Sequence, residues 1–131
     1  MKREGRPRGY GPSHILVVED DESINKLLKI VLERAGYIVR VVDTYAGAVS
    51  AVQDAEPSLV VLDLGLPDGN GLDLLKWMRA DLGLSVPVVV LSAFRQEEKV
   101  GKAFELGAND FMSKPFRPQE LMSRIQRVLD V

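Results

Sequence analysis

The sequence predicts a doubly wound α/β domain in which five parallel strands alternate with five helices. From residue 14 onward, short apolar runs alternate five times with longer amphipathic stretches, and strict strand–helix alternation favours a parallel sheet. The apolar runs are nearly continuous Val, Ile and Leu, as a sheet covered by helices on both faces requires. A chain of 131 residues is long enough for one such domain and too short for two ordinary ones.

The strands are expected to be short, and several end directly before polar residues. The first carries the run Ile-Leu-Val-Val before Glu19, and the third carries Leu-Val-Val-Leu before Asp63. We place the five strands at residues 14–18, 38–42, 58–62, 87–91 and 109–113.

The first helix is predicted from apolar residues that recur at i, i+3, i+4, i+7, i+8 and i+11, a spacing that gives one buried face. Gly36 follows this segment at a position where a left-handed cap is usual. Thr44 is suited to cap the second helix, and Pro57 follows its end. The apolar positions of the first helix are Ile24, Leu27, Leu28, Val31, Leu32 and Ala35.

Three further helices are predicted from the same type of pattern. The fourth, at about residues 96–106, is expected to turn Val100, Ala103 and Phe104 inward, and the last spans about 118–129. Apolar residues of the third and fifth helices are Leu72, Leu75 and Met78, and Leu121, Ile125 and Val128, respectively.

Composition narrows the functional classes. Hydrophobic residues make up 46% and charged residues 27% of the chain, which is ordinary for a globular protein. No apolar run approaches the roughly 18 residues of a membrane span, and the absence of cysteine excludes disulfides and is compatible with a cytoplasmic location.

Charge is distributed unevenly along the chain. Residues 1–14 carry four basic and one acidic group, a net of +3, whereas the other 117 residues carry 13 basic and 18 acidic groups, a net of −5. We therefore expect residues 1–13 to be a disordered basic tail, or a stretch not native to the protein, and residues 14–131 to be the folded domain. The acidic domain is a poor candidate for direct nucleic-acid contact.

Polar residues gather at the predicted carboxyl ends of the strands, where open α/β sheets bind ligands. They are the acidic run that begins at Glu19 and Asp20, then Asp63, Ser92 and Lys114. Strand ends are often polar simply because they face solvent. Several carboxylates beside one lysine and one hydroxyl, however, favour a binding site.

The chemistry of this set points to Mg²⁺ and a phosphoryl group. Clustered carboxylates repel one another unless a cation lies among them, and a hard divalent ion prefers oxygen ligands. No histidine or cysteine accompanies the cluster, which argues against zinc. A lysine and a hydroxyl can hold phosphoryl oxygens, and phosphoryl transfer depends mainly on such positioning and electrostatics.

Four sequence motifs resemble the receiver domains of two-component response regulators. They are the runs ILVVEDD (15–21), VVLDLGLPDGNG (60–71), VVVLSA (88–93) and GANDFMSKPF (107–116). The resemblance covers roughly residues 14–130, with the motifs in the family's order and spacing. It implies a flavodoxin-like sheet of strand order 2-1-3-4-5.

By this resemblance, Asp63 is the phosphoacceptor, which takes its phosphoryl group from a sensor histidine kinase or a phosphotransfer protein. Asp20 and Asp63 ligate Mg²⁺ directly, Glu19 acts mostly through water, and Gly65 supplies a backbone carbonyl. Lys114 pairs with a phosphoryl oxygen and precedes a cis proline.

The resemblance also implies a switch. Ser92 hydrogen-bonds the phosphoryl group and moves inward, and an aromatic residue on the fifth strand, Phe111, turns to fill the space. Phe111 can equally be read as a plain core residue, and it lacks the hydroxyl that many relatives carry here.

The resemblance also implies two positions that tune attack by water on the phosphoryl group. They are Gly65, two residues after Asp63, and Phe94, two residues after Ser92.

The motifs leave open which process the receiver regulates. The segment 116–125 is similar to receivers that precede winged-helix DNA-binding domains, which pair through helix 4, strand 5 and helix 5. Asp110, Glu120 and Arg124 match their interlocking charges, whereas Val100 replaces a basic residue of helix 4. A transcription regulator with an output domain outside this sequence is the main interpretation. The alternatives are a stand-alone phosphorelay receiver and a pseudo-receiver that only binds partners.

Overall fold

A computed structural model describes residues 14–93 and 97–129 of the chain. The predicted tail at residues 1–13, the predicted role of Phe94 and the start of the fourth helix at Gln96 lie outside the described residues. The division between tail and domain therefore stays a prediction.

One parallel sheet organises the described residues, in the order β2-β1-β3-β6-β7. If the small hairpin β4–β5 is left out of the count, this is the predicted order 2-1-3-4-5. The sheet strands are β1 (His14–Val18), β2 (Ile38–Val42), β3 (Leu59–Asp63), β6 (Val88–Ser92) and β7 (Asp110–Ser113). The hairpin strands are β4 (Gly65–Leu66) and β5 (Gly69–Asn70).

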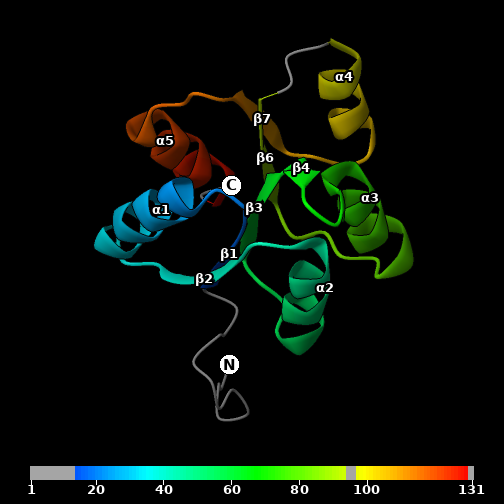
Figure 1. The fold of residues 1–131 in the computed structure, drawn as a ribbon, viewed down its shortest axis with the longest axis horizontal. Coiled ribbons are helices and arrows are strands. Elements are labelled where there is room, and N and C mark those ends of the chain that lie inside the picture. The colour runs from blue at the N-terminus through cyan, green and yellow to red at the C-terminus, as the bar shows by residue number, and fades with distance from the viewer. Residues whose placement is uncertain (1–13, 94–96, 130–131) are drawn as a thin grey trace.

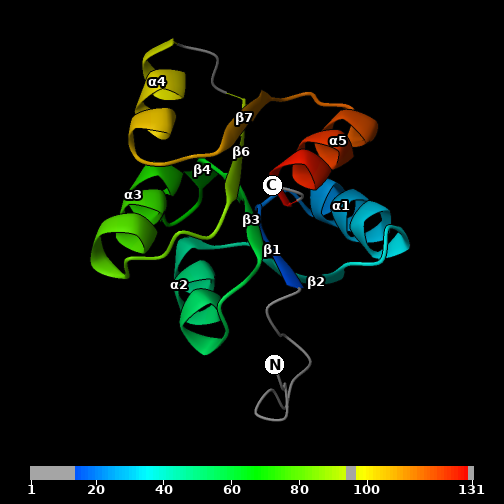
Figure 2. The ribbon, with the colours of Figure 1, turned by 180° about the vertical axis from the view of Figure 1, so that it is seen from behind.

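Within the described ranges, five α-helices cover both faces of the sheet, as the near-continuous apolar strands predicted (Figure 1). Helices α1 and α5 lie on one face, and α2, α3 and α4 lie on the other, as the reverse view also shows (Figure 2). The helices are α1 (Glu22–Arg34), α2 (Tyr45–Asp54), α3 (Gly71–Lys76), α4 (Glu97–Glu105) and α5 (Pro118–Leu129). None of the helices formed by the described residues has the length and apolar character needed to cross a bilayer.

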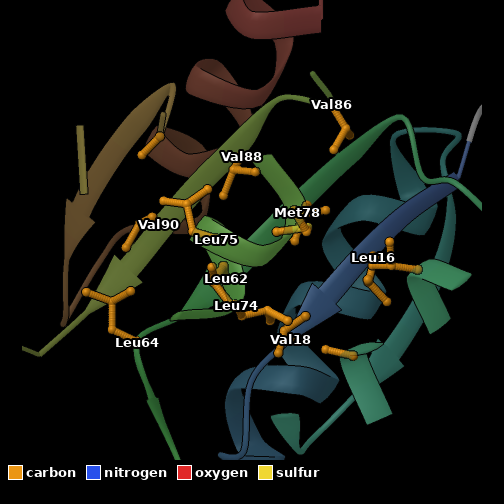
Figure 3. Packing of buried hydrophobic residues seen from close by; sticks show 14 of the residues in the cluster. Leu16, Val18, Leu62, Leu64, Leu74, Leu75, Met78, Val86, Val88 and Val90 are labelled. Carbon is orange, nitrogen blue, oxygen red and sulfur yellow. The ribbon is translucent and has the colours of Figure 1, made fainter. Parts of the chain in front are cut away.

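Alternate residues of each strand enter two separate cores, because successive side chains of a strand point to opposite faces. In β1, Ile15 and Val17 pack toward α1 and α5, whereas Leu16 and Val18 pack toward the other helices. The second core is shown in Figure 3, where side chains of α3 lie against those of β1, β3 and β6. Strands β1, β3 and β6 are buried along their whole length.

The predicted helix boundaries rest on identifiable caps. The Thr44 hydroxyl accepts a hydrogen bond from the Gly47 amide at 2.9 Å, which caps α2 as predicted. Gly36, with φ of +98°, follows α1 in the left-handed conformation that ends many helices. The Asp21 carboxylate caps the start of α1 by accepting from the Ile24 amide at 3.1 Å.

The third helix has a feature that its sequence pattern did not predict. It ends at Lys76 and continues as one π-helical turn, η1 (Trp77–Asp81), in which the Leu82 amide donates to the Trp77 carbonyl at 3.1 Å. The Arg79 guanidinium in this turn donates to the Gly107 carbonyl, 28 residues away. The partner of Arg79 is remote in the sequence, so this contact leaves no local sequence signal.

Three residues predicted to face inward are exposed, and one of them, Ala35, lies at the C-cap of α1. Leu27 of α1 is 41% exposed and Phe104 of α4 is 47% exposed. Each lies directly beside a fully buried residue, Leu28 and Ala103, and neighbouring helix positions are rotated by about 100° around the axis. The apolar residues of these helices therefore extend further around the helix surface than the part that packs against the sheet.

Two leucines of α1 provide a direct test of this burial pattern. We expect Leu32→Ala to lower the free energy of unfolding by about 2–5 kcal/mol, because Leu32 is fully buried and its loss leaves a cavity. Leu27→Ala, on the same helix, should cost less than about 1 kcal/mol. Urea unfolding of both variants measures the difference, and equal losses would contradict the exposed position of Leu27.

Candidate functional site

The predicted site residues lie at the carboxyl edge of the sheet, on four neighbouring strands. Glu19 and Asp20 directly follow β1, Asp63 closes β3, Ser92 closes β6 and Lys114 directly follows β7. Since β1, β3, β6 and β7 are adjacent and parallel, their carboxyl ends meet. The structure thus brings together residues that are up to 95 positions apart in the chain.

Three carboxylates form a compact acidic cluster. Glu19, Asp20 and Asp63 each offer an oxygen, and these oxygens lie within 4.8 Å of one another. The side chains of Glu19 and Asp63 are almost completely buried, whereas Asp20 is exposed. The cluster therefore has one side open to solvent, through which an ion or a substrate can enter.

Lys114 places one positive charge inside this cluster. Its Nζ lies 2.6 Å from Oε1 of Glu19 and 3.5 Å from Oδ1 of Asp63. The backbone positions this residue, because the Lys114 amide donates to the Ser92 carbonyl at 2.8 Å. The Lys114–Pro115 peptide bond is cis, as expected from the sequence resemblance.

Burial changes the proton affinities of the cluster. Removal from water raises the pKa of Glu19 to about 7, although Lys114 and the Asp21 amide favour its charged form. Burial also raises the pKa of Asp63, and Lys114 partly opposes this shift. Burial alone would lower the pKa of Lys114, but the paired Glu19 and Asp63 carboxylates raise it, so the lysine stays charged.

The charge balance calls for a further cation. Three carboxylates and one ammonium leave an excess of negative charge in a largely buried place. The available donor atoms are carboxylate oxygens, the ligands that hard divalent ions prefer. The described residues of the cluster thus fit a magnesium ion.

The segment after Asp63 forms the hairpin β4–β5, which the sequence analysis did not predict. The Gly65 amide donates a hydrogen bond to Oδ1 of Asp63 at 3.4 Å. Gly71 ends the hairpin at a close backbone approach, since a Cβ there would lie 2.6 Å from the Asp63 carbonyl oxygen. The Gly69-Asn70-Gly71 run, which begins six residues after Asp63, was the available sequence signal for this constraint.

The start of α1 also contributes to the site. Asp21 caps the helix through its side chain, and its amide donates to Oε2 of Glu19 at 3.0 Å. The Asn25 side chain donates to the Glu19 carbonyl. Asp21 and Glu22 thus lie at the helix start, and the helix start holds Glu19 in position. Asn25 was missed, because its role depends on the turn between β1 and α1.

Comparison with known proteins identifies the family. Residues 15–126 match the family model described as the response regulator receiver domain. This chain belongs to that family. The fold likeness agrees, since the chain superposes on a CheY-like receiver domain protein from Methanospirillum hungatei with a TM-score of 0.85 at 27% identity. That match covers 90% of this chain and 94% of the other.

Full-length relatives of this receiver include regulators of transcription. The DNA-binding response regulator MtrA of Mycolicibacterium smegmatis is 43% identical over 112 residues, which are 86% of this chain and 48% of MtrA. The transcriptional regulatory protein GltR of Pseudomonas aeruginosa is 41% identical over 116 residues, 88% of this chain and 48% of GltR. The receiver of NtrX from Brucella abortus superposes with a TM-score of 0.82 at 33% identity, covering 89% and 98% of the two chains. This receiver spans about half the length of the curated relatives it matches.

Ser92 and Phe111 of the receiver are close in the sheet. Phe111 on β7 is in register with Val90, two residues before Ser92 on β6. Ser92 is fully buried, and Phe111 is half-buried against the core under α2, α3 and α4. Strand alternation turns both side chains toward that same face. The arrangement is compatible with a coupled movement and equally with plain packing.

The three residues predicted for a dimer face interact within one receiver. Arg124 of α5 donates to Oδ1 of Asp110 at 2.7 Å and to Oε2 of Glu120 at 3.0 Å. They lie on the predicted elements, β7 and α5. Their charges are therefore already paired in the single chain, and an interface between copies would have to exchange or share these pairs.

The raised pKa of Glu19 predicts how stability varies with pH in the absence of divalent ions. The pKa of Glu19 in the folded state, about 7, exceeds its ordinary value of 4.5. Between pH 4.5 and pH 7 the folded state therefore binds more protons than the unfolded state. Glu19 should therefore lower the free energy of unfolding as pH rises from 4.5 to 7. In Glu19→Gln the decline should be smaller, as measured by urea unfolding across this range in EDTA. The exposed Glu22→Gln should keep the wild-type slope, and an unchanged slope in Glu19→Gln would contradict the assignment.

Proposed function

We propose that this receiver accepts a phosphoryl group on Asp63 from a sensor histidine kinase or a phosphotransfer protein. The observation that carries the proposal is the position of the Asp63 carboxylate. It is buried between two acidic neighbours and lies 3.5 Å from the Lys114 ammonium. A carboxylate that is held, largely desolvated and faced by one cation is prepared for nucleophilic attack on an electrophilic phosphorus.

The proposed reaction forms an acyl phosphate. An oxygen of Asp63 attacks phosphorus, the P–N bond to the donor imidazole breaks, and the imidazole leaves as the neutral ring after taking up a proton. Lys114 would neutralise one phosphoryl oxygen, and the Ser92 hydroxyl would donate to another. The Lys114–Glu19 ion pair at 2.6 Å holds the lysine at the site before the donor arrives.

A magnesium ion is part of the proposal. Asp20 and Asp63 would hold it directly, Glu19 mainly through water, and Gly65 through its carbonyl oxygen. When bound, the ion supplies positive charge that offsets the negative charge of the transferring group. The exposed Asp20 lies on the open side of the cluster, which suits an ion that keeps several water ligands.

The proposed output is regulation of transcription through a domain outside this sequence. The regulators MtrA and GltR, each about twice the length of the matched region, support it.

The proposed switch couples phosphorylation, through Ser92 and Phe111, to the face formed by α4, β7 and α5, which would form the homodimer. In a stand-alone phosphorelay receiver the same chemistry would pass the phosphoryl group onward. We propose a cytoplasmic location and no direct nucleic-acid contact by the receiver itself.

Phosphorylation can be tested with a small donor. Incubation with Mg²⁺ and acetyl phosphate should add one phosphoryl mass to the wild type, and EDTA should prevent it. Asp63→Asn should gain nothing because the nucleophile is lost, whereas Asp73→Asn, exposed on α3, should behave as wild type. Intact-mass spectrometry at mild pH reads out the acyl phosphate. Equal gain by Asp63→Asn would refute Asp63 as the acceptor, and no gain by the wild type would favour the pseudo-receiver.

Magnesium binding can be tested with two adjacent aspartates. Asp20→Asn should weaken Mg²⁺ affinity about tenfold or more, because it removes a carboxylate from the cluster. Asp21→Asn should bind normally, since Asn caps a helix as well as Asp does. Amide chemical shifts near Asp63, followed through a Mg²⁺ titration, give both affinities. Equal affinities for the two variants would contradict the proposed ligand set.

A further inference from the structure

An exposed aspartate, Asp68, connects the hairpin β4–β5 to the start of α2. The Tyr45 amide donates to its Oδ1 at 2.6 Å, and the Ala46 amide donates to its Oδ2 at 3.1 Å. These two amides belong to the first turn of α2, where backbone N–H groups have no partner within the helix. Their hydrogen bonds lower the pKa of Asp68, so it is ionised at neutral pH.

A second contact holds the same hairpin tip. A Cβ at Gly69 would lie 2.7 Å from Cδ2 of the Tyr45 ring, so only glycine lets the tip approach the ring this closely. Helix α2 is itself anchored on the sheet by the buried Ala48, Ala51 and Val52. The hairpin tip is therefore attached to a fixed element.

The hairpin transmits this attachment to the site. Leu66 pairs with Gly69, and Gly65 pairs with Asn70, so Gly65 lies one step from the fastened tip. Below it, the Gly71 amide donates to the Leu64 carbonyl at 2.9 Å. A Cβ on Gly65 would meet no atom within 4 Å, so the hairpin backbone, and not side-chain packing, sets where Gly65 lies.

We infer that Asp68 is a positioning residue for the Mg²⁺ and phosphoryl site. It fastens the hairpin to α2 and so holds the Gly65 carbonyl, which the proposed function makes a Mg²⁺ ligand. This inference rests on the magnesium part of that function. Asp68 acts through the backbone of its own loop and touches neither the ion nor the phosphoryl group.

Thr44 offers a matched control, because its side chain caps the same turn of α2 through a hydrogen bond that stays within the helix. Its hydroxyl accepts from the Gly47 amide at 2.9 Å. Thr44→Ala should therefore weaken α2 much as Asp68→Ala does while leaving the hairpin attached. If Asp68 served only to cap α2, Asp68→Ala and Thr44→Ala would have the same Mg²⁺ affinity and the same rate of phosphorylation.

The experiment compares Asp68→Ala, Asp68→Asn and Thr44→Ala in the full chain. Asp68→Ala should raise the Kd for Mg²⁺ about tenfold, as loss of an outer positioning group does, and should slow phosphorylation by acetyl phosphate. Asp68→Asn keeps one acceptor oxygen and should show a smaller effect. Thr44→Ala should stay within about twofold of wild type despite a lower Tm. In metal-free protein, the Gly65 amide resonance should move in Asp68→Ala and stay in place in Thr44→Ala.

The outcomes separate this inference from the proposed function. Wild-type Mg²⁺ affinity in Asp68→Ala, or an equal loss in Thr44→Ala, would overturn the role of Asp68 even if Asp63 is phosphorylated normally. A wild type that binds Mg²⁺ in an Asp68-dependent way but gains no phosphoryl group would refute the phosphoacceptor function and leave the positioning role intact.

Discussion

The site depends on the electrostatic balance between buried carboxylates and one lysine. Glu19 and Asp63 are taken out of water at the end of the sheet, where each carboxylate loses hydration and repels its neighbours. The Lys114 ammonium, 2.6 Å from Glu19, offsets only part of this cost. The negative charge that Lys114 leaves uncompensated favours a divalent ion on the open side of the cluster, beside Asp20.

The parallel sheet is what makes this crowding possible. Its strands β1, β3, β6 and β7 are adjacent, and helices α1, α5 on one face and α2, α3, α4 on the other exclude water from them (Figures 1 and 2). The two cores therefore support the site from below. Rigid strand ends hold Asp63 and Ser92, and loop backbone holds Gly65 and Lys114.

The loops are in turn held by hydrogen bonds that lie outside the acidic cluster. The start of α1 holds Glu19 through the Asp21 amide and the Asn25 side chain. The start of α2 holds the hairpin after Asp63 through Asp68. Both helix starts satisfy free amides with a carboxylate. At α2 the capping interaction itself holds the hairpin, whereas at α1 separate hydrogen bonds beside the cap hold Glu19.

The sequence by itself determined the fold class, the strand order through the family resemblance, and the residues that gather at the carboxyl edge. This was possible because near-continuous apolar strands report burial directly, and because parallel strand ends must meet. Tertiary structure alone decided the rest. The exposure of Leu27 and Phe104 depends on how much of each helix the sheet covers. The hydrogen bond from Arg79 to Gly107, the Asp68 attachment and the pairing of Arg124 with Asp110 join residues 14 to 28 positions apart, and a local pattern carries no information about such partners.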